Sequence, residues 1–171
     1  MKFKQYLNED KFLNAKKYEK ILYGALLSFL KNKFNLNSPI EVSLRKPSKK
    51  RLFGWIDLIG LKNGKYKIII ENQSPLTNIG AIAHEFTHIL QFHEGRLDYT
   101  KDEKNFIWNH KVHMSIKDYN KITNLAEYKQ VPWEKEAYKN QEEIPSLFLK
   151  SKEYKDLKGL DINLDFIMDN I

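Results

Sequence analysis

The chain contains no cysteine among its 171 residues. A disulfide framework and a zinc site built from thiolates are therefore both excluded, and the absence is consistent with a reducing compartment. No apolar run approaches the roughly 20 residues that a membrane-spanning helix needs. The N-terminus also lacks the apolar stretch of a secretory signal. We expect a cytoplasmic protein that does not interact with a membrane.

Arginine is scarce, although the chain is basic. The formal net charge is +7, yet only three of the 29 basic side chains are arginines, namely Arg45, Arg51 and Arg96. Hydrogen bonds to nucleic-acid bases and bidentate contacts with phosphates favour arginine over lysine. We interpret the one dense basic run, residues 45–51, as a solvated loop between two strands rather than a patch for an anionic partner. Nucleic acid is thus a disfavoured partner, although the positive net charge does not exclude it.

Internal repeats and low-complexity linkers are absent as well. A chain of this length supports one hydrophobic core but not two independent ones, so we expect a single domain over residues 1–171. An Asn63-Gly64 pair predicts a hairpin between the second and third strands. Hydrophobic periodicity predicts these elements in order: a helix over about 8–32, strands at 40–44, 52–61 and 66–71, a helix over about 78–94, a hairpin over 105–114 turning near Asn109-His110, and a helix from Pro132. This order indicates an α+β domain with an N-terminal helix and a small antiparallel sheet.

The most informative segment is His84-Glu85-Phe86-Thr87-His88, an HExxH motif. Two histidines four residues apart lie one helical turn from each other, so both can bind one cation. Glu85 lies near the same face, close enough to deprotonate a metal-bound water. The apolar residues of this helix gather on the opposite side: Ile79, Ile82, Phe86, Ile89 and Leu90. The motif predicts a Zn²⁺ site with ligands His84 and His88 and with Glu85 as the catalytic base; two polar histidines on a solvated helix face are the alternative.

A catalytic zinc also needs a third protein ligand and an open position for water. The metzincin spacing requires a glycine where this chain has Gln91 and a histidine where it has Glu94, so that class is excluded. His93 lies on the apolar side of the helix and does not replace it. The remaining possibility is a carboxylate from a second helix.

The helix that begins at Pro132 offers two carboxylates, Glu134 and Glu136. They lie two residues apart, so only one can point at the metal. We favour Glu136, because the small Ala137 beside it would let the two helices approach closely. Glu134 stays open as the alternative ligand. If no metal binds, the two glutamates are explained as acidic residues at the start of a helix, where they complement the helix dipole.

The HExxH segment, continued by Ile89-Leu90-Gln91, and the later Pro132-Trp133-Glu134-Lys135-Glu136-Ala137-Tyr138 together resemble small zinc metallopeptidases found in phages and prophages. In that family a Trp-containing hairpin separates the two motifs, and Phe106-Ile107-Trp108-Asn109-His110-Lys111-Val112 matches it. The resemblance covers about residues 40–140. It implies a minimal gluzincin-like zincin domain in which His84, His88 and Glu136 bind zinc and Glu85 is the base. A phage-encoded protein would act in the host cytoplasm.

The function predicted from these motifs is zinc-dependent hydrolysis of a peptide or protein substrate. The group that stabilises the oxyanion is left open among His110, His113, Tyr119, Tyr128 and Tyr138. An extended peptide could add to the strand at 66–71 if its edge is open. Two alternatives remain: a catalytically silent zinc-binding partner protein of phage or mobile-element origin, and a SprT-like nucleic-acid-associated protease. The sequence predicts neither the substrate nor the oligomeric state.

Overall fold

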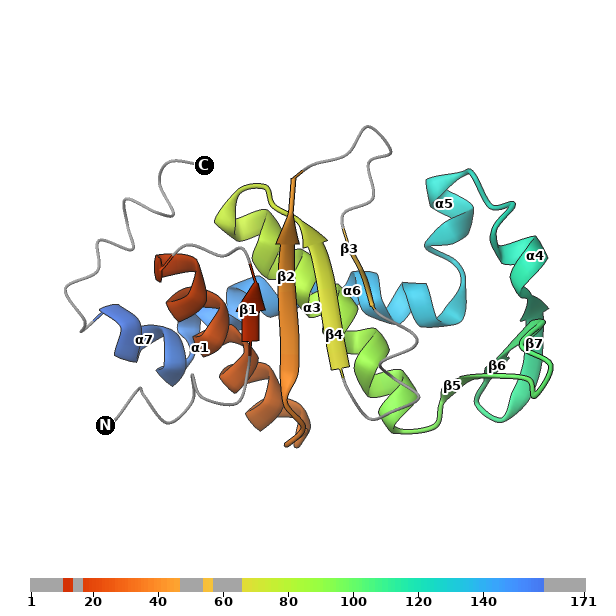
Figure 1. The fold of residues 1–171 in the computed structure, drawn as a ribbon, viewed down its shortest axis with the longest axis horizontal. Coiled ribbons are helices and arrows are strands. Elements are labelled where there is room, and N and C mark those ends of the chain that lie inside the picture. The colour runs from red at the N-terminus through yellow and green to blue at the C-terminus, as the bar shows by residue number, and fades with distance from the viewer. Residues whose placement is uncertain (1–10, 14–16, 47–53, 57–65, 159–171) are drawn as a thin grey trace.

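The computed structural model describes residues 11–13, 17–46, 54–56 and 66–158. Figure 1 shows the four-stranded sheet near the middle of the view, and the three-stranded sheet at the right-hand end. The predicted α+β class is confirmed. Among the described residues, no helix combines the length and the apolar character that a membrane crossing would need.

The first sheet contains four strands in the order β1-β2-β4-β3. Their bounds are β1 Lys11–Leu13, β2 Ile40–Arg45, β3 Gly54–Ile56 and β4 Tyr66–Glu71. β2 pairs in parallel with both β1 and β4, and only β3 runs antiparallel to its neighbour β4. The expectation of a purely antiparallel sheet is therefore wrong, because β2 and β4 pair directly although β3 lies between them in the sequence.

Helix α1 (Lys17–Phe34) joins the parallel strands β1 and β2, as a crossover connection between parallel strands must. The helix expected from about residue 8 thus begins at Lys17, and residues 11–13 form a strand instead. β4 is paired on both sides, so β1 and β3 are the two edge strands of this sheet among the described strands. The Asn63-Gly64 turn lies outside the described residues.

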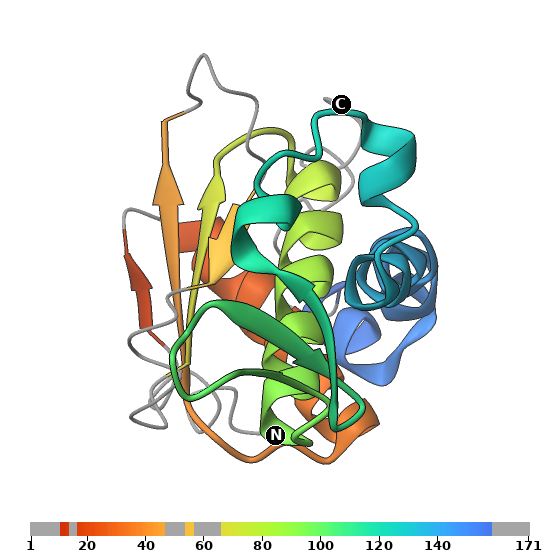
Figure 2. The same cartoon turned by 90° about the vertical axis from the view of Figure 1, so that its right-hand side faces the viewer.

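Helix α3 (Pro75–His93) carries the HExxH motif and lies between the first sheet and α6 (Figure 2). Its N-cap is Ser74, whose hydroxyl accepts a hydrogen bond from the Thr77 backbone N–H at 3.2 Å. Pro75 occupies the first turn, where a missing N–H leaves no helical hydrogen bond unmade. The helix therefore begins three residues earlier than expected. It ends before Gly95, as the sequence predicts.

The second sheet is antiparallel, with the order β5-β6-β7. It comprises β5 (Leu97–Tyr99), β6 (Asn105–Trp108) and β7 (Lys111–Ser115). The hairpin predicted at 105–114 is confirmed, and its turn residues Asn109 and His110 have φ angles of 47° and 64°. Two positive φ angles in succession are typical of a type I′ turn. The short helices α4 (Ile116–Tyr119) and α5 (Leu125–Tyr128) then lead to α6.

Helix α6 (Pro132–Lys150) begins at the predicted proline and continues through Pro145. It lies along α3 in the antiparallel sense, since Gln91 contacts Trp133 at one end and Gly80 approaches Gln141 at the other. Helix α7 (Lys152–Lys158) follows and packs on α1. The main core lies between the sheet and the helices α1, α3, α6 and α7, and its fully buried members include Leu22, Leu26, Val42, Ile68, Ile82, Phe86 and Phe148.

Candidate metal centre

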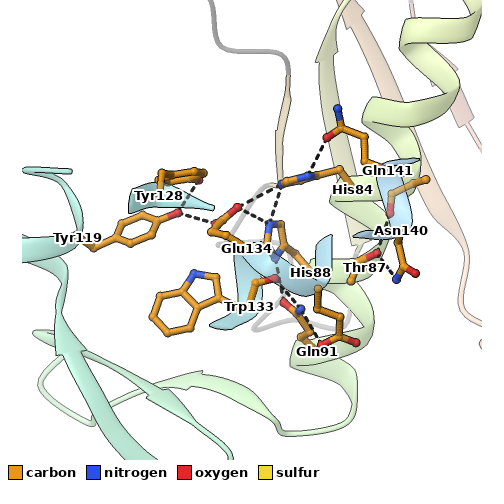
Figure 3. A network of polar contacts seen from close by, with 12 residues as sticks. His84, Thr87, His88, Gln91, Tyr119, Tyr128, Trp133, Glu134, Asn140 and Gln141 are labelled. Atoms are coloured by element: carbon orange, nitrogen blue, oxygen red, sulfur yellow. Dashed lines mark hydrogen bonds and ion pairs between the residues drawn. The ribbon is translucent and has the colours of Figure 1, made fainter. Parts of the chain in front are cut away.

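Three potential metal ligands meet where α3 packs on α6 (Figure 3). The Nε2 atoms of His84 and His88 lie 3.2 Å apart. Oε2 of Glu134 lies 3.3 Å from Nε2 of His84 and 3.6 Å from Nε2 of His88. The residues are 8%, 8% and 2% exposed, respectively. Among the described residues, this is the one group of three or more such side chains within ligand distance of one another.

The spacing of these atoms fits a tetrahedral metal. Zinc bonds of about 2.0–2.1 Å at tetrahedral angles place neighbouring ligand atoms about 3.3 Å apart. The separations of 3.2, 3.3 and 3.6 Å are close to that value. Oε2 of Glu134 is also buried without a well-formed hydrogen bond to any described residue. A buried carboxylate oxygen is costly to leave in that state, and a bound cation would satisfy it.

The two histidines are held by glutamine side chains. Nδ1 of His84 lies 3.0 Å from Oε1 of Gln141, and Nδ1 of His88 lies 2.9 Å from Oε1 of Gln91. An amide oxygen only accepts hydrogen bonds, so each Nδ1 carries the proton and donates it. In the neutral form of each ring, Nε2 then has the lone pair and faces the other ligands, as metal binding requires. Neither glutamine was among the residues predicted for the site, although Gln91 lies three residues after His88 and therefore on the same helix face.

The charges in this group are strongly coupled. Burial alone would raise the pKa of Glu134, but the facing imidazoles of His84 and His88 hold it well below its ordinary value. Burial alone would lower the pKa of His88, but the adjacent Glu134 carboxylate raises it to about 9. Without a metal, a proton on His88 therefore offsets the buried negative charge of Glu134. A divalent cation would replace that proton.

Glu85, the predicted base, lies beside the three ligands and against the edge strand β3. Burial raises its pKa above the ordinary value, while the nearby His88 and His84 oppose that shift. The backbone of β3 approaches closely, because a Cβ atom at Gly54 would lie 3.0 Å from Oε1 of Glu85. The structure thus brings three of the predicted site residues, His84, Glu85 and His88, into one buried cluster.

The fourth predicted site residue, Glu136, lies elsewhere. It accepts two hydrogen bonds from Arg96, with its Oε2 2.6 Å from Nη1 and its Oε1 3.0 Å from Nη2. Glu134 takes the expected ligand position instead, so the preference for Glu136 is corrected. The reason is helical geometry: Glu134 shares the buried face of α6 with Ala137 and Ile144, and a residue two positions later is rotated away from it.

Two tyrosines lie on the far side of Glu134 from the histidines (Figure 3). The Tyr119 hydroxyl donates a hydrogen bond to Oε1 of Glu134 at 2.6 Å. The Tyr128 hydroxyl lies 2.6 Å from that of Tyr119, whose own proton is already donated, so Tyr128 is the donor in this pair. Burial raises the pKa of both tyrosines far above the ordinary value, which keeps both protonated. Oε2 of Glu134 is therefore the oxygen left free for a metal.

The remaining candidates for oxyanion stabilisation differ in their distance from the centre. The ring of Tyr138 packs edge-on against that of His84, with 4.7 Å between centroids. Among the described residues, its hydroxyl has no hydrogen-bond partner, in contrast to Tyr119 and Tyr128. His110 lies exposed in the β6–β7 turn, and the exposed His113 contacts the ring of Trp133 rather than the ligands.

Comparison of the chain with models of protein families, with curated proteins and with solved structures gives no match. The residues of the metal centre are therefore the basis on which a function can be assigned.

Proposed function

We propose that the protein is a zinc metallopeptidase in which His84, His88 and Glu134 bind the metal and Glu85 is the general base. The observation that carries the proposal is the convergence of two Nε2 atoms and one carboxylate oxygen at tetrahedral spacing. A His₂Glu set on an HExxH helix is the ligand arrangement of catalytic rather than closed structural zinc sites, because it leaves a fourth position open.

The chemistry would divide between the metal and Glu85. Bound zinc would act as a Lewis acid toward the peptide carbonyl and would lower the pKa of a metal-bound water toward about 7. Glu85 takes the proton as the water oxygen forms its bond to the carbonyl carbon. It returns that proton to the amide nitrogen as the carbon–nitrogen bond breaks. Burial raises the pKa of Glu85, which moves it toward the range in which a base works near neutral pH.

The hydrogen bond from Tyr119 supports an open coordination position. It occupies Oε1 of Glu134, so the carboxylate offers the metal one oxygen rather than two. The protons of Tyr119 and Tyr128 are both committed to this chain of hydrogen bonds. Tyr138, which packs on His84, is therefore our choice among the five candidates for contacting the oxyanion.

A peptide substrate could add to β3 as a further strand. The strand at 66–71 could take this role only with an open edge, and β4 is paired on both sides. β3 ends the sheet among the described strands and runs directly past Glu85. An extended peptide paired with β3 would therefore lie alongside the proposed base.

The test is a peptide-hydrolysis assay on a quenched fluorescent peptide library, with zinc content measured on the same samples. We expect zinc-loaded wild-type protein to cleave peptides and a chelator to abolish the cleavage. Glu85→Gln should retain zinc but lose activity, because only the base is removed. His84→Ala should lose zinc as well. A wild-type protein that binds zinc no better than His84→Ala would contradict the proposal, and activity that survives in Glu85→Gln would contradict the role of the base.

A further inference from the structure

Gln91 is a buried side chain beside the metal centre whose orientation is fixed by hydrogen bonds. It is fully buried, and its amide makes three hydrogen bonds. Nε2 donates to the Trp133 carbonyl oxygen at 2.9 Å and to Oε2 of Glu136 at 3.2 Å. Oε1 accepts from Nδ1 of His88 at 2.9 Å. Both N–H groups therefore face acceptors on α6, which directs the amide oxygen at His88.

Glu136 is in turn held by Arg96. The guanidinium group contacts both carboxylate oxygens of Glu136 and also donates to Glu94 at 2.6 Å. It lies over the ring of Trp108, 5.4 Å from the centroid. This pair is partly exposed, with side-chain exposures of 30% for Arg96 and 35% for Glu136. A chain of contacts thus runs inward from Arg96 through Glu136 and Gln91 to a metal ligand.

We propose that Arg96 and Glu136 are positioning residues that act through Gln91 to hold His88 in the Nδ1-protonated tautomer. The inference rests on the proposed metal site and deepens it, since it assigns a role to the carboxylate that is not a ligand. Outer-shell hydrogen bonds of this kind orient a metal-binding histidine and increase its basicity.

The role proposed for Glu136 and Arg96 follows from the two orientations of the Gln91 amide, which differ by an exchange of its oxygen and nitrogen. Rotating the Gln91 amide by 180° would present Nε2 to His88 and would stabilise the tautomer in which Nδ1 carries the lone pair. Nε2 of His88 would then carry a proton toward Glu134 and could not bind a metal. In the rotated state Oε1 of Gln91 would face two acceptors, the Trp133 carbonyl and the Glu136 carboxylate. The negative charge on Glu136 makes that state costly, and Arg96 keeps the charge in place.

A purely structural role for the Arg96–Glu136 pair makes a different prediction. The pair joins the segment after α3 to the second turn of α6, so its loss could loosen both helices. Any effect on zinc affinity would then be independent of Gln91. An effect transmitted through Gln91 must instead disappear when Gln91 is already absent, because non-additivity marks residues that act as one unit.

The experiment is a double-mutant cycle on the full chain, with zinc affinity measured by chelator competition. We expect Glu136→Gln to weaken zinc binding by about 10-fold or more, the scale of outer-shell changes. In a Gln91→Met background the same substitution should change affinity by less than about twofold, the error of additivity. The matched control is Asn140→Ala, which removes a 3.0 Å hydrogen bond to Thr87 on the same interface and should stay within about twofold of wild type. Equal losses in both backgrounds, or no loss in Glu136→Gln, would overturn the inference.

A second readout needs no metal and therefore separates this inference from the proposed function. The side-chain amide protons of Gln91 should exchange slowly in the wild-type protein and at least about tenfold faster in Arg96→Met and Glu136→Gln, with unchanged global stability in urea. This comparison also decides the matter if Gln91→Met fails to fold. Unchanged exchange would overturn the positioning role even if zinc binds, and failure of the wild type to bind zinc would remove the proposed function alone.

Discussion

Gly54 on β3 approaches Glu85 on α3 so closely that a Cβ atom at position 54 would lie 3.0 Å from Oε1 and 3.1 Å from Cγ of the glutamate. The same Cβ atom would also lie 3.1 Å from Cγ2 of Ile70 on the neighbouring strand. The buried base is thus confined between its own helix and the edge strand. Its position depends on the absence of a side chain at Gly54.

Gly54→Ala should displace Glu85 without removing a metal ligand. We expect zinc content to remain at the wild-type level while kcat/KM for peptide cleavage falls about 100-fold, the effect of an error of about 1 Å in a catalytic group. Zinc analysis and a quenched peptide assay on the same sample measure the two quantities. Wild-type activity in the alanine variant would show that Glu85 tolerates the contact and that this approach does not constrain the base.

Tyr119→Phe should weaken zinc binding, because it removes the hydrogen bond that holds Oε1 of Glu134. We expect a loss of zinc affinity of about 10-fold, again the scale of outer-shell changes. The free energy of unfolding should fall by about 1–3 kcal/mol, because the buried Oε1 loses its donor. Tyr128→Phe is the matched control: it removes the same kind of hydroxyl one step farther out and should have a smaller effect. A larger loss in Tyr128→Phe than in Tyr119→Phe would contradict this order of contacts.

Zinc affinity should depend on pH with a definite sign. The pKa of His88 is raised to about 9 in the metal-free centre, so the ring is protonated at neutral pH. Zinc must displace that proton, and its apparent affinity should rise with pH by up to about tenfold per unit below 9 and level off above it. Chelator competition between about pH 6 and 8, corrected for protonation of the chelator, measures the slope. A flat profile would show that His88 is already neutral before the metal binds.

Gly95, after the last turn of α3, offers a test of backbone conformation alone. Its φ is 69°, and a Cβ atom there would meet nothing within 4 Å. Gly95→Ala should therefore lower the free energy of unfolding by about 1 kcal/mol through the left-handed backbone alone. Gly95→Asn should cost less, because asparagine tolerates this conformation. Urea denaturation measures both, and equal stability of wild type and Gly95→Ala would contradict the conformational assignment.

Local patterns predicted the elements around the centre well. The spacing of His84 and His88 against an apolar stripe identified α3, and Asn109-His110 identified the β6–β7 turn. Both depend on interactions within a few residues. The mixed sheet depends instead on pairing between β2 and β4 across an intervening strand. Alternation within a strand indicates which face is buried but not which strand is its neighbour.

The choice between Glu134 and Glu136 could have been made from the sequence. Ala137, Gln141, Ile144 and Phe148 follow one another at helical spacing, and at about 100° per residue Glu134 lies about 50° from the centre of that stripe. Glu136 lies about 110° from it by the same count. The preference for Glu136 rested on the segment Pro132–Tyr138 alone, whereas most of the stripe lies beyond it, in a helix that continues through Pro145 to Lys150.

The most direct test of the metal centre is anomalous diffraction at the zinc absorption edge from crystals of the zinc-loaded protein. We expect one strong peak between α3 and α6, about 2.0–2.1 Å from Nε2 of His84, Nε2 of His88 and Oε2 of Glu134. Glu136 should remain paired with Arg96. The absence of a peak between these three side chains, or a peak whose third ligand is Glu136, would contradict this expectation.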